Sequence, residues 1–238
     1  MRLQNTSRRH LLACACCGIG AGVLPGPGRA WAAEAAHQHT QMSPDEALKR
    51  LKEGNANFVT DLPFHGVQGR ERRVEIARGQ TPFAVLVGCS DSRVSPELLF
   101  GRGLGELFIY RVAGNTVDRA ALGSIEYAVA ELGVPLILVL GHERCGAVAA
   151  AVSVVEKNTI FPGAIGEMVE PIVPAVLRAR SQPGDLLDNA VRENVRGIVG
   201  RLRQEGPILA NAIGAGKLKI VGARYDLDDG AVDFFAET

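Results

Sequence analysis

Two apolar runs in this sequence each end in side chains that bind soft metal ions. Cys89 follows the run 83–87, and His142 and Cys145 follow the run 134–140. Short, continuous apolar runs are typical of buried strands in a parallel sheet, and ligands bind at the carboxyl ends of such strands. Two thiolates and one imidazole leave the fourth position of a tetrahedral zinc ion open, which is the pattern of a catalytic rather than a structural site. We therefore predict one catalytic Zn²⁺ bound by Cys89, His142 and Cys145.

The first of these loops also carries an acid and a cation. Asp91 and Arg93 come two and four residues after Cys89. Asp91 could occupy the fourth zinc position itself, or it could lie beside that position and accept a hydrogen bond from a zinc-bound water. A bidentate guanidinium keeps a carboxylate ionised and holds it off the metal, so Arg93 favours the second arrangement. We expect both residues to be catalytic, and a surface ion pair without a role is the alternative.

The segments that must position these side chains alternate between strand and helix patterns. This alternation predicts a single α/β domain with a central, mostly parallel sheet flanked by helices. We expect strands at 83–87, 107–112, 134–140, 218–221 and 232–235, with a hairpin turn at 228–230. We expect helices from 44 to about 57–61 and at 71–78, 96–99, 119–132, 146–155, 163–180, 185–204 and 207–213.

The backbone near two of the candidate residues also carries information. Cys145 lies at the start of the helix predicted at 146–155, where the helix dipole favours the thiolate form. Gly114 follows the strand predicted at 107–112. This glycine marks either a close approach of another group to the backbone or a plain turn.

The N-terminal segment has the features of an export signal. Residues 1–9 are basic and polar, residues 11–24 are mildly apolar, and Ala30–Ala32 fits a signal-peptidase site. Arg8 and Arg9, followed closely by leucines, match a twin-arginine signal, which is used for folded cargo. An ordinary secretory signal and a lipoprotein signal are the alternatives.

This signal fixes the expected domain organisation and cysteine count. Residues 1–32 form the signal peptide, residues 33–42 a flexible N-terminal arm, and residues 43–238 the catalytic domain. Three of the five cysteines lie within the signal, so the mature chain keeps Cys89 and Cys145. In an exported protein, one disulfide between them is the alternative to a metal site. We expect a periplasmic protein whose mature form is not in a membrane.

Composition excludes one class of function. The chain has 238 residues, 47% of them hydrophobic, and a formal net charge of zero. This length allows one sizeable core. A protein that binds nucleic acid would need an excess of basic residues, so we expect no nucleic acid among the partners.

The paired loops resemble those of the β-class carbonic anhydrases. The likeness rests on the segments Cys89-Ser-Asp-Ser-Arg93 and His142-Glu-Arg-Cys145-Gly146, each after an apolar strand. It runs over most of the mature chain, from Leu51–Asn55 to Asp229-Gly230. The resemblance implies a β-carbonic anhydrase-like fold. It also implies reversible hydration of carbon dioxide to bicarbonate and a proton by a zinc-bound hydroxide, with one Zn²⁺ per subunit.

The resemblance also assigns roles to pocket residues. Members with an open zinc site line the CO₂/bicarbonate pocket with a glutamine, a phenylalanine and a tyrosine, which fall here on Gln80, Phe108 and Tyr127. Gly114 is expected to be substrate-binding too. Because the pocket of the family is formed across a dimer, a homodimer or a larger even assembly is implied.

Two departures and two alternatives accompany this resemblance. Ala147 follows Gly146 where many members have a second glycine, and Arg144 is an uncommon residue between His142 and Cys145. Hydrolysis of CS₂ or COS on the same scaffold is one alternative function. A non-catalytic exported protein that binds zinc or forms a disulfide is the other.

Overall fold

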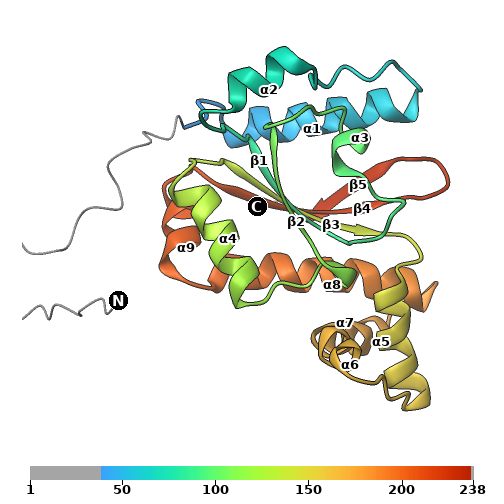
Figure 1. Cartoon of the computed structure of the whole chain (residues 1–238). Coiled ribbons are helices and arrows are strands. Elements are labelled where there is room, and N and C mark those ends of the chain that lie inside the picture. Colours follow the sequence, from blue (N-terminus) through green and yellow to red (C-terminus); the bar gives the residue numbers. More distant parts are fainter. Residues whose placement is uncertain (1–38, 237–238) are drawn as a thin grey trace, which may run out of the picture. The chain divides into compact units, whose positions relative to one another are not determined.

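The computed structural model describes residues 39–236 (Figure 1). The expected signal peptide, residues 1–32, and the first part of the expected arm lie outside the described residues. Residues 39–42, which complete that arm, have no helix or strand. Among the described residues, no helix is both long enough and apolar enough to cross a membrane.

The described strands form a five-stranded sheet in the order β2-β1-β3-β4-β5. Four strands are parallel, and β5 is antiparallel to β4. This arrangement confirms the predicted α/β domain with a mostly parallel sheet. The strands are β1 (Ala84–Gly88), β2 (Leu107–Arg111), β3 (Leu136–His142), β4 (Lys219–Tyr225) and β5 (Val232–Ala236).

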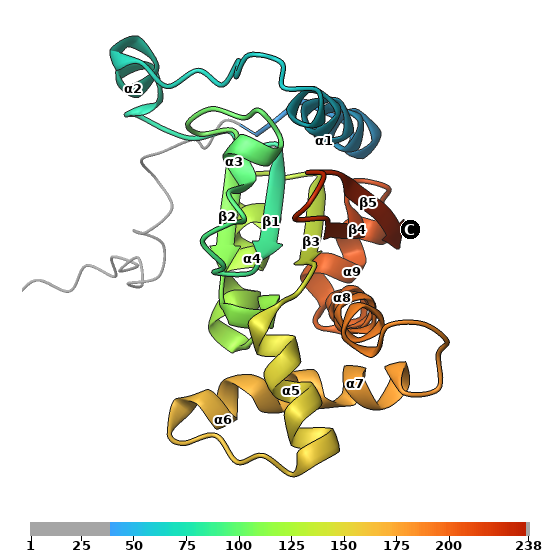
Figure 2. The ribbon, with the colours of Figure 1, turned by 90° about the vertical axis from the view of Figure 1, so that its right-hand side faces the viewer.

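Helices cover both faces of this sheet and its carboxyl edge (Figures 1 and 2). The α-helices are α1 (Pro44–Val59), α2 (Arg70–Ile76), α3 (Pro96–Leu99), α4 (Arg119–Ala130), α5 (Gly146–Lys157), α6 (Ala164–Val169), α7 (Val173–Ala179), α8 (Leu186–Gln204) and α9 (Pro207–Gly214). Two short 3₁₀ helices are η1 (Ala113–Asn115) and η2 (Glu170–Ile172).

The start of α1 follows from its sequence. The hydroxyl of Ser43 accepts a hydrogen bond from the backbone N–H of Glu46, whose carboxylate accepts one from the backbone N–H of Ser43. This reciprocal capping satisfies backbone donors that the first turn leaves unpaired. Pro44 fills the first helical position, where its missing N–H has no consequence.

The prediction of a single helix at 163–180 is wrong. The chain instead forms α6, η2 and α7 in succession. Pro171 lies in η2 and Pro174 in the first turn of α7. A proline has no N–H for the helical hydrogen-bond ladder and its ring crowds the preceding turn, so the α-helix is interrupted at these positions. The backbone at Val169, Ile172 and Val173 nevertheless stays in the right-handed region.

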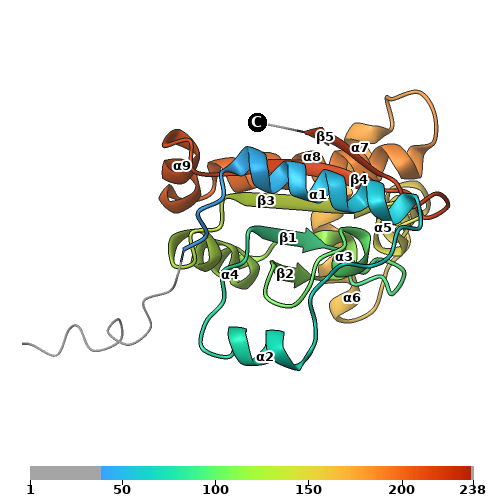
Figure 3. The ribbon, with the colours of Figure 1, turned by 90° about the horizontal axis from the view of Figure 1, so that it is seen from above.

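Two apolar cores lie on opposite faces of the sheet, because successive strand residues point to opposite faces. Val85 and Val87 of β1 pack with α4, α8 and α9, whereas Leu86 of the same strand packs with α1 and α3. Figure 3 shows α1 running along the sheet on its own face. β1 and β3 are buried along their whole length. The prediction that both apolar runs form buried strands of a parallel sheet is therefore confirmed.

A third apolar cluster lies at the carboxyl edge of the sheet. Here α5, α6 and α7 pack beyond the ends of β1 and β2 (Figure 2). Cys89 and Cys145 belong to this cluster and are almost completely buried. The sheet edge and the helices thus enclose the expected metal ligands together.

Candidate metal centre

Parallel pairing brings the two ligand loops to one edge of the sheet. β1 and β3 are neighbours, and Gly88 at the end of β1 pairs with Leu140 near the end of β3. Cys89 follows Gly88 directly, and His142 is the last residue of β3. Cys145 is the N-cap of α5. Two strands and one helix therefore position the three side chains.

The donor atoms of Cys89, His142 and Cys145 lie within 4.8 Å of one another. The two Sγ atoms are 4.0 Å apart. Zn–S bonds of about 2.3 Å in a tetrahedral site would place the sulfurs about 3.8 Å apart. A disulfide would need a separation of about 2.05 Å, and both cysteines are free thiols. The spacing therefore suits a metal ion held between the sulfurs.

The imidazole of His142 is prepared for a metal at Nε2. The side chain is fully buried, and its Nδ1 lies 2.9 Å from the backbone oxygen of Glu143. Donation from Nδ1 to this carbonyl leaves the lone pair of Nε2 available, as in most histidines that bind metals. Nε2 has no hydrogen-bond partner among the described residues. An unpaired buried nitrogen is costly, and a metal ion at this position would satisfy it.

The thiol of Cys89 lies in surroundings that favour its thiolate. Hydrogen bonding from Cys145 lowers the pKa of Cys89 to about 4, against the opposing effect of burial. The backbone N–H of Gly114 lies 3.4 Å from Sγ and adds to this lowering. A thiolate is the form that binds zinc.

The pKa of the Cys145 thiol shifts in the opposite direction, because the two cysteines share one proton. The hydrogen bond to Cys89 raises the pKa of Cys145, and burial raises it further. The backbone N–H groups of Ala147 and Val148 at the start of α5 lower it, as the helix dipole predicts, but they are outweighed. A divalent cation between the sulfurs would take the place of this proton.

Asp91 and Arg93 form a bidentate ion pair beside the cluster. Nε and Nη2 of Arg93 donate to Oδ1 and Oδ2 of Asp91 at 2.9 and 2.8 Å, and the backbone N–H of Arg93 donates to Oδ1 at 3.0 Å. These hydrogen bonds hold the pKa of Asp91 well below its usual range. Oδ2 lies 3.8 Å from Nε2 of His142. An ionised carboxylate therefore borders the space into which the metal ligands point.

Arg111, at the end of β2, holds the backbone of the first loop. Its Nε donates to the carbonyl oxygen of Cys89 at 2.8 Å, and its Nη2 donates to that of Asp91 at 2.7 Å. No sequence pattern predicts this role of Arg111. Its position at the end of a strand next to β1 was the available signal, but strand order had to be known first.

Gly114 is joined to the metal cluster through its backbone. Its N–H donates to Sγ of Cys89, and its carbonyl accepts a hydrogen bond of 2.9 Å from the buried side chain of Asn194 on α8. Its φ is 75°, and a Cβ here would lie 2.5 Å from Cδ1 of Ile172. The glycine is therefore required both by the left-handed backbone and by the close approach of a neighbour.

The other three expected pocket residues, Gln80, Phe108 and Tyr127, lie on segments other than the two ligand loops. Gln80 is exposed and precedes β1, so it lies at the end of that strand opposite to Cys89. Phe108 is half-buried on β2 and pairs with Val85, in the first half of β1. Tyr127 lies on α4 and is 41% exposed.

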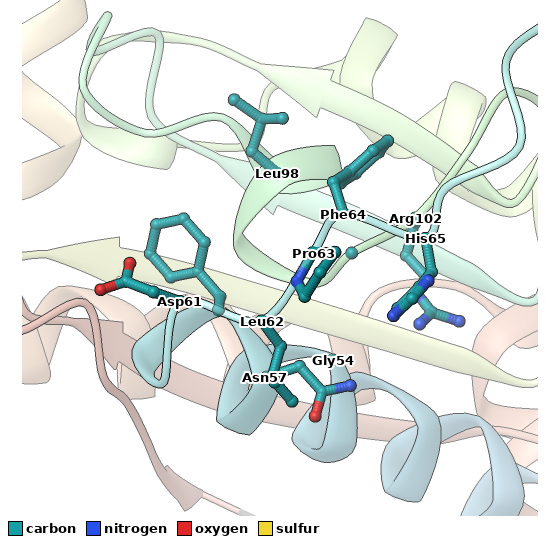
Figure 4. A pocket seen from close by; sticks show the side chains of 11 residues that line it. Gly54, Asn57, Asp61, Leu62, Pro63, Phe64, His65, Leu98 and Arg102 are labelled. Atoms are coloured by element: carbon teal, nitrogen blue, oxygen red, sulfur yellow. The ribbon is translucent and has the colours of Figure 1, made fainter.

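A separate cavity lies at the end of α1. It has a volume of about 270 Å³ and is formed by α1, the following loop and α3 (Figure 4). Cys89, His142 and Cys145 are not among the residues that line it. Its lining residues are Gly54, Asn57, Phe58, Asp61, Leu62, Pro63, Phe64, His65, Leu98, Gly101 and Arg102.

Comparison with known proteins identifies the family. A family model described as carbonic anhydrase matches residues 84–232. A carbonic anhydrase of Mycolicibacterium smegmatis is 44% identical over 191 residues, which cover 80% of this chain and 93% of that protein.

Two solved structures extend this comparison to the fold. The β-carbonic anhydrase of Coccomyxa, in complex with acetazolamide, has a TM-score of 0.62 at 30% identity, over 69% of this chain and 77% of that one. A structure described among tetrameric β-carbonic anhydrases of Sordaria macrospora has a TM-score of 0.62 at 27% identity, over 69% of this chain and 86% of that one. The sequence and the structure together establish that this chain belongs to the β-class carbonic anhydrase family.

Proposed function

We propose that this protein is a zinc-dependent carbonic anhydrase that catalyses the reversible hydration of CO₂ to bicarbonate and a proton, with one Zn²⁺ per subunit. Membership of the family supports the reaction. The observation that carries the cofactor is the buried cluster of Cys89, His142 and Cys145, in which a buried nitrogen has no partner among the described residues.

The donor set defines how zinc would be held. Sγ of Cys89, Nε2 of His142 and Sγ of Cys145 would supply three ligands, which would leave a fourth position for water. When bound, Zn²⁺ lowers the pKa of a coordinated water enough to supply hydroxide near neutral pH. Burial of the three side chains by α5 and its neighbours keeps bulk solvent away from the ligands.

Asp91 and Arg93 supply the orientation. Ionised Asp91 accepts a hydrogen bond at Oδ2 from the water that reacts, which fixes the direction of the water's lone pair towards CO₂. Arg93 occupies both carboxylate oxygens and so holds Asp91 beside the metal position rather than on it. This pairing supports a site that stays open to water.

The alternatives have less support. A metal store or a disulfide has no use for the Asp91–Arg93 pair, and the sulfurs are 4.0 Å apart as free thiols. Hydrolysis of CS₂ or COS would use the same side chains, and no contact in the site favours a sulfur-containing substrate. Hydration of CO₂ is therefore the function that we propose.

The proposal is tested by metal content and by stopped-flow CO₂ hydration with a pH indicator. We expect about one zinc per chain and rapid hydration, both lost in His142→Ala. Ser90→Ala, an exposed change on the first ligand loop, is the matched control and should keep both. Full CO₂ hydration in metal-free wild-type protein would contradict the proposal.

The assembly is also proposed, as a homodimer or a larger even oligomer. β2 is an edge strand that is only half-buried, and apolar side chains near the cavity of α1 are exposed, including Leu62 at 52% and Leu98 at 53%. A neighbouring subunit would cover such surfaces. It would also explain why Gln80, which lies at the far end of β1 from Cys89, is expected in a substrate pocket.

Mixed oligomers test whether the pocket is shared between subunits. A Gln80→Ala chain should have low activity, and a Cys89→Ser chain should have none. Co-refolding or co-expression of the two should raise the activity above that of Gln80→Ala alone, because an intact Cys89 site would then meet an intact Gln80 from its partner. No gain in confirmed mixed dimers would place the pocket within one chain.

Export to the periplasm is proposed from the twin-arginine pattern alone. Arg8 and Arg9 support recognition as folded cargo, which would let the thiolates bind metal before they meet an oxidising compartment. Replacing both residues by lysine should leave the protein in the cytoplasm of a bacterial host, as measured by fractionation. Normal export of that variant would favour an ordinary secretory signal.

A further inference from the structure

The second ligand loop contains a residue in an unusual backbone conformation. Arg144 lies between His142 and Cys145 and has a φ of 51°. This is the left-handed region, which glycine adopts freely and which a residue with a Cβ adopts at a cost. A feature of this kind persists when contacts around it hold it in place. Arg144, next to the expected metal ligand Cys145, is therefore held in a conformation that is unfavourable for an arginine without such contacts.

The value of this φ matters for His142. The carbonyl of Glu143 accepts the hydrogen bond from Nδ1 of His142 at 2.9 Å. That carbonyl belongs to the peptide unit between Glu143 and Arg144, and φ of Arg144 sets the orientation of this unit relative to Cys145 and α5. A rotation to the ordinary right-handed region would turn the carbonyl away. The ring orientation of His142 thus depends on the conformation of Arg144.

A distant turn holds Arg144. Its Nη1 and Nη2 donate to Oδ2 and Oδ1 of Asp228 at 2.9 and 2.7 Å, in a bidentate pair between residues 84 positions apart. Asp228 lies in the turn between β4 and β5. This turn is braced in its own right, because Oδ1 of Asp226 accepts the backbone N–H of Asp228 at 2.9 Å.

Glu143 fastens the same loop to the same region. Its backbone N–H donates to the carbonyl of Tyr225 at 2.9 Å, and its carboxylate accepts the N–H of Leu227 at 3.3 Å. The carboxylates of Glu143, Asp226 and Asp228 lie close together, and Arg144 and Arg224 pair with them.

We propose that Arg144 is a positioning residue for the metal site. Its two hydrogen bonds to Asp228 hold the ligand loop in the left-handed conformation that directs the Glu143 carbonyl to Nδ1 of His142, and so keep Nε2 aimed at the metal. This inference rests on the proposed zinc site. The pair is exposed, 49% at Arg144 and 71% at Asp228, and exposed ion pairs are weak. We therefore expect a graded loss of metal affinity rather than its abolition.

Comparing two replacements of Arg144 separates the backbone from the charge. Arg144→Ala removes the ion pair and keeps the conformational cost, so zinc affinity should fall about three- to tenfold. This loss is at or below the lower end of the range of about 10–100-fold for residues that support metal ligands, because the pair is exposed. Arg144→Gly also removes the ion pair, but glycine takes this φ freely. Its zinc affinity should stay within about twofold of wild type. Asp228→Asn should resemble Arg144→Ala.

The measurement is zinc affinity by competition with a chromophoric chelator at fixed pH. The visible spectrum of the Co²⁺-substituted protein reports the ligand geometry directly, and it should shift in Arg144→Ala and return in Arg144→Gly. Arg144→Ala/Asp228→Asn should be no worse than Arg144→Ala alone, because both changes break one contact. Arg196→Ala removes an arginine of similar exposure, 45%, from an ion pair on α8 and should leave both readouts unchanged.

Each result bears on the proposal. Wild-type zinc affinity in Arg144→Ala would overturn it, and so would equal losses in Arg144→Ala and Arg144→Gly. If wild-type protein bound zinc and hydrated CO₂ while the Arg144 variants were unchanged, only this inference would fail. If wild-type protein bound no zinc, the proposed function itself would fail.

Discussion

The two ligand loops leave neighbouring strands of one sheet, but each uses its arginine differently. In the first loop, Arg93 turns back onto Asp91, two residues away, and so fixes a carboxylate at the reaction space. In the second loop, Arg144 reaches Asp228, 84 positions along the chain. In the proposed mechanism the first arrangement supplies a group for chemistry, and in the role proposed for Arg144 the second supplies a support for the loop.

This difference separates two kinds of effect that are otherwise easily confused. Loss of the local pair should change the reaction at a metal site that remains intact. Loss of the distant pair should change how firmly the metal is held, while the reaction of the loaded site stays the same. Turnover at saturating zinc and affinity for zinc are the two measurements that distinguish them.

The largest expected effect comes from the ligands themselves, where the loops should not differ. Cys89→Ser and Cys145→Ser each replace a thiolate by a hydroxyl that stays protonated, so either should reduce CO₂ hydration by about 10³-fold or more and lose zinc on dialysis. Metal analysis with stopped-flow assays measures both. A zinc-loaded, active Cys145→Ser protein would show that the second loop contributes only His142.

The next effect concerns the first loop alone. Arg93→Leu removes both side-chain hydrogen bonds to Asp91 and keeps only the backbone one to Oδ1, so Oδ2 can turn towards the metal position and no longer orients water. Turnover should fall about 100-fold with zinc content unchanged, which is within the range of positioned acid–base groups. Arg93→Lys keeps the charge but loses the bidentate geometry, so its turnover should lie between those of wild type and Arg93→Leu. If Arg93→Leu instead lost zinc as Cys89→Ser does, the contrast between the loops would be wrong.

The same division between local and distant contacts decides how much of the fold and of the site the sequence predicts. The apolar runs of β1 and β3, the ligand triad and the Asp91–Arg93 spacing are local patterns, and the strands and the parallel sheet follow from them. The Arg144–Asp228 and Arg111–Cys89 contacts depend on which strands and turns become neighbours. No spacing along the chain encodes that information.

The other limits of prediction from the sequence have equally physical causes. The helix expected at 163–180 is interrupted because two prolines override an apolar period that is otherwise helical. Gly114 was equally compatible with a plain turn, since only the folded chain reveals that Ile172 and Sγ of Cys89 approach it. The roles of Gln80, Phe108 and Tyr127 rest on family resemblance rather than on any pattern in their own surroundings, and they stay predictions.

A third prediction tests whether the backbone at Gly114, which supports Cys89, matters as much for zinc binding as the Arg144–Asp228 pair of the second loop. In Gly114→Ala, the new Cβ would meet Ile172 and Ala147, at a φ that alanine avoids. We expect destabilisation of about 1–3 kcal/mol, together with weaker zinc binding, because η1 must shift away from Cys89. Gly123→Ala is the matched control, since nothing lies within 4 Å of its Cβ and α4 should gain stability. Equal thermal stability of the two variants would show that η1 adapts freely.

The smallest expected effect is at Glu193, away from both loops. It gives a reference for how much pairing with arginine contributes to the stability of the fold. Glu193 on α8 accepts hydrogen bonds from Gln182, Arg178 and Arg196, and its side chain is 12% exposed. Burial raises the pKa of Glu193, but the three donors outweigh it and the pKa lies below the usual value. Because the folded pKa is the lower one, the carboxylate stabilises the fold above pH about 4.5 and progressively less as the pH falls.

Glu193→Gln should therefore cost about 1 kcal/mol at pH 7, or about 2–4 °C in Tm, and the difference from wild type should shrink below pH 4. Zinc loss at low pH affects wild type and variant alike, so it cancels in the difference. Glu156→Gln, an exposed change on α5, should show no such pH dependence. A Tm difference for Glu193→Gln that stayed constant from pH 7 to pH 3 would mean that shape rather than charge sets its contribution. The carboxylates paired with Arg93 and Arg144 would then need the same test before their charge is given a role.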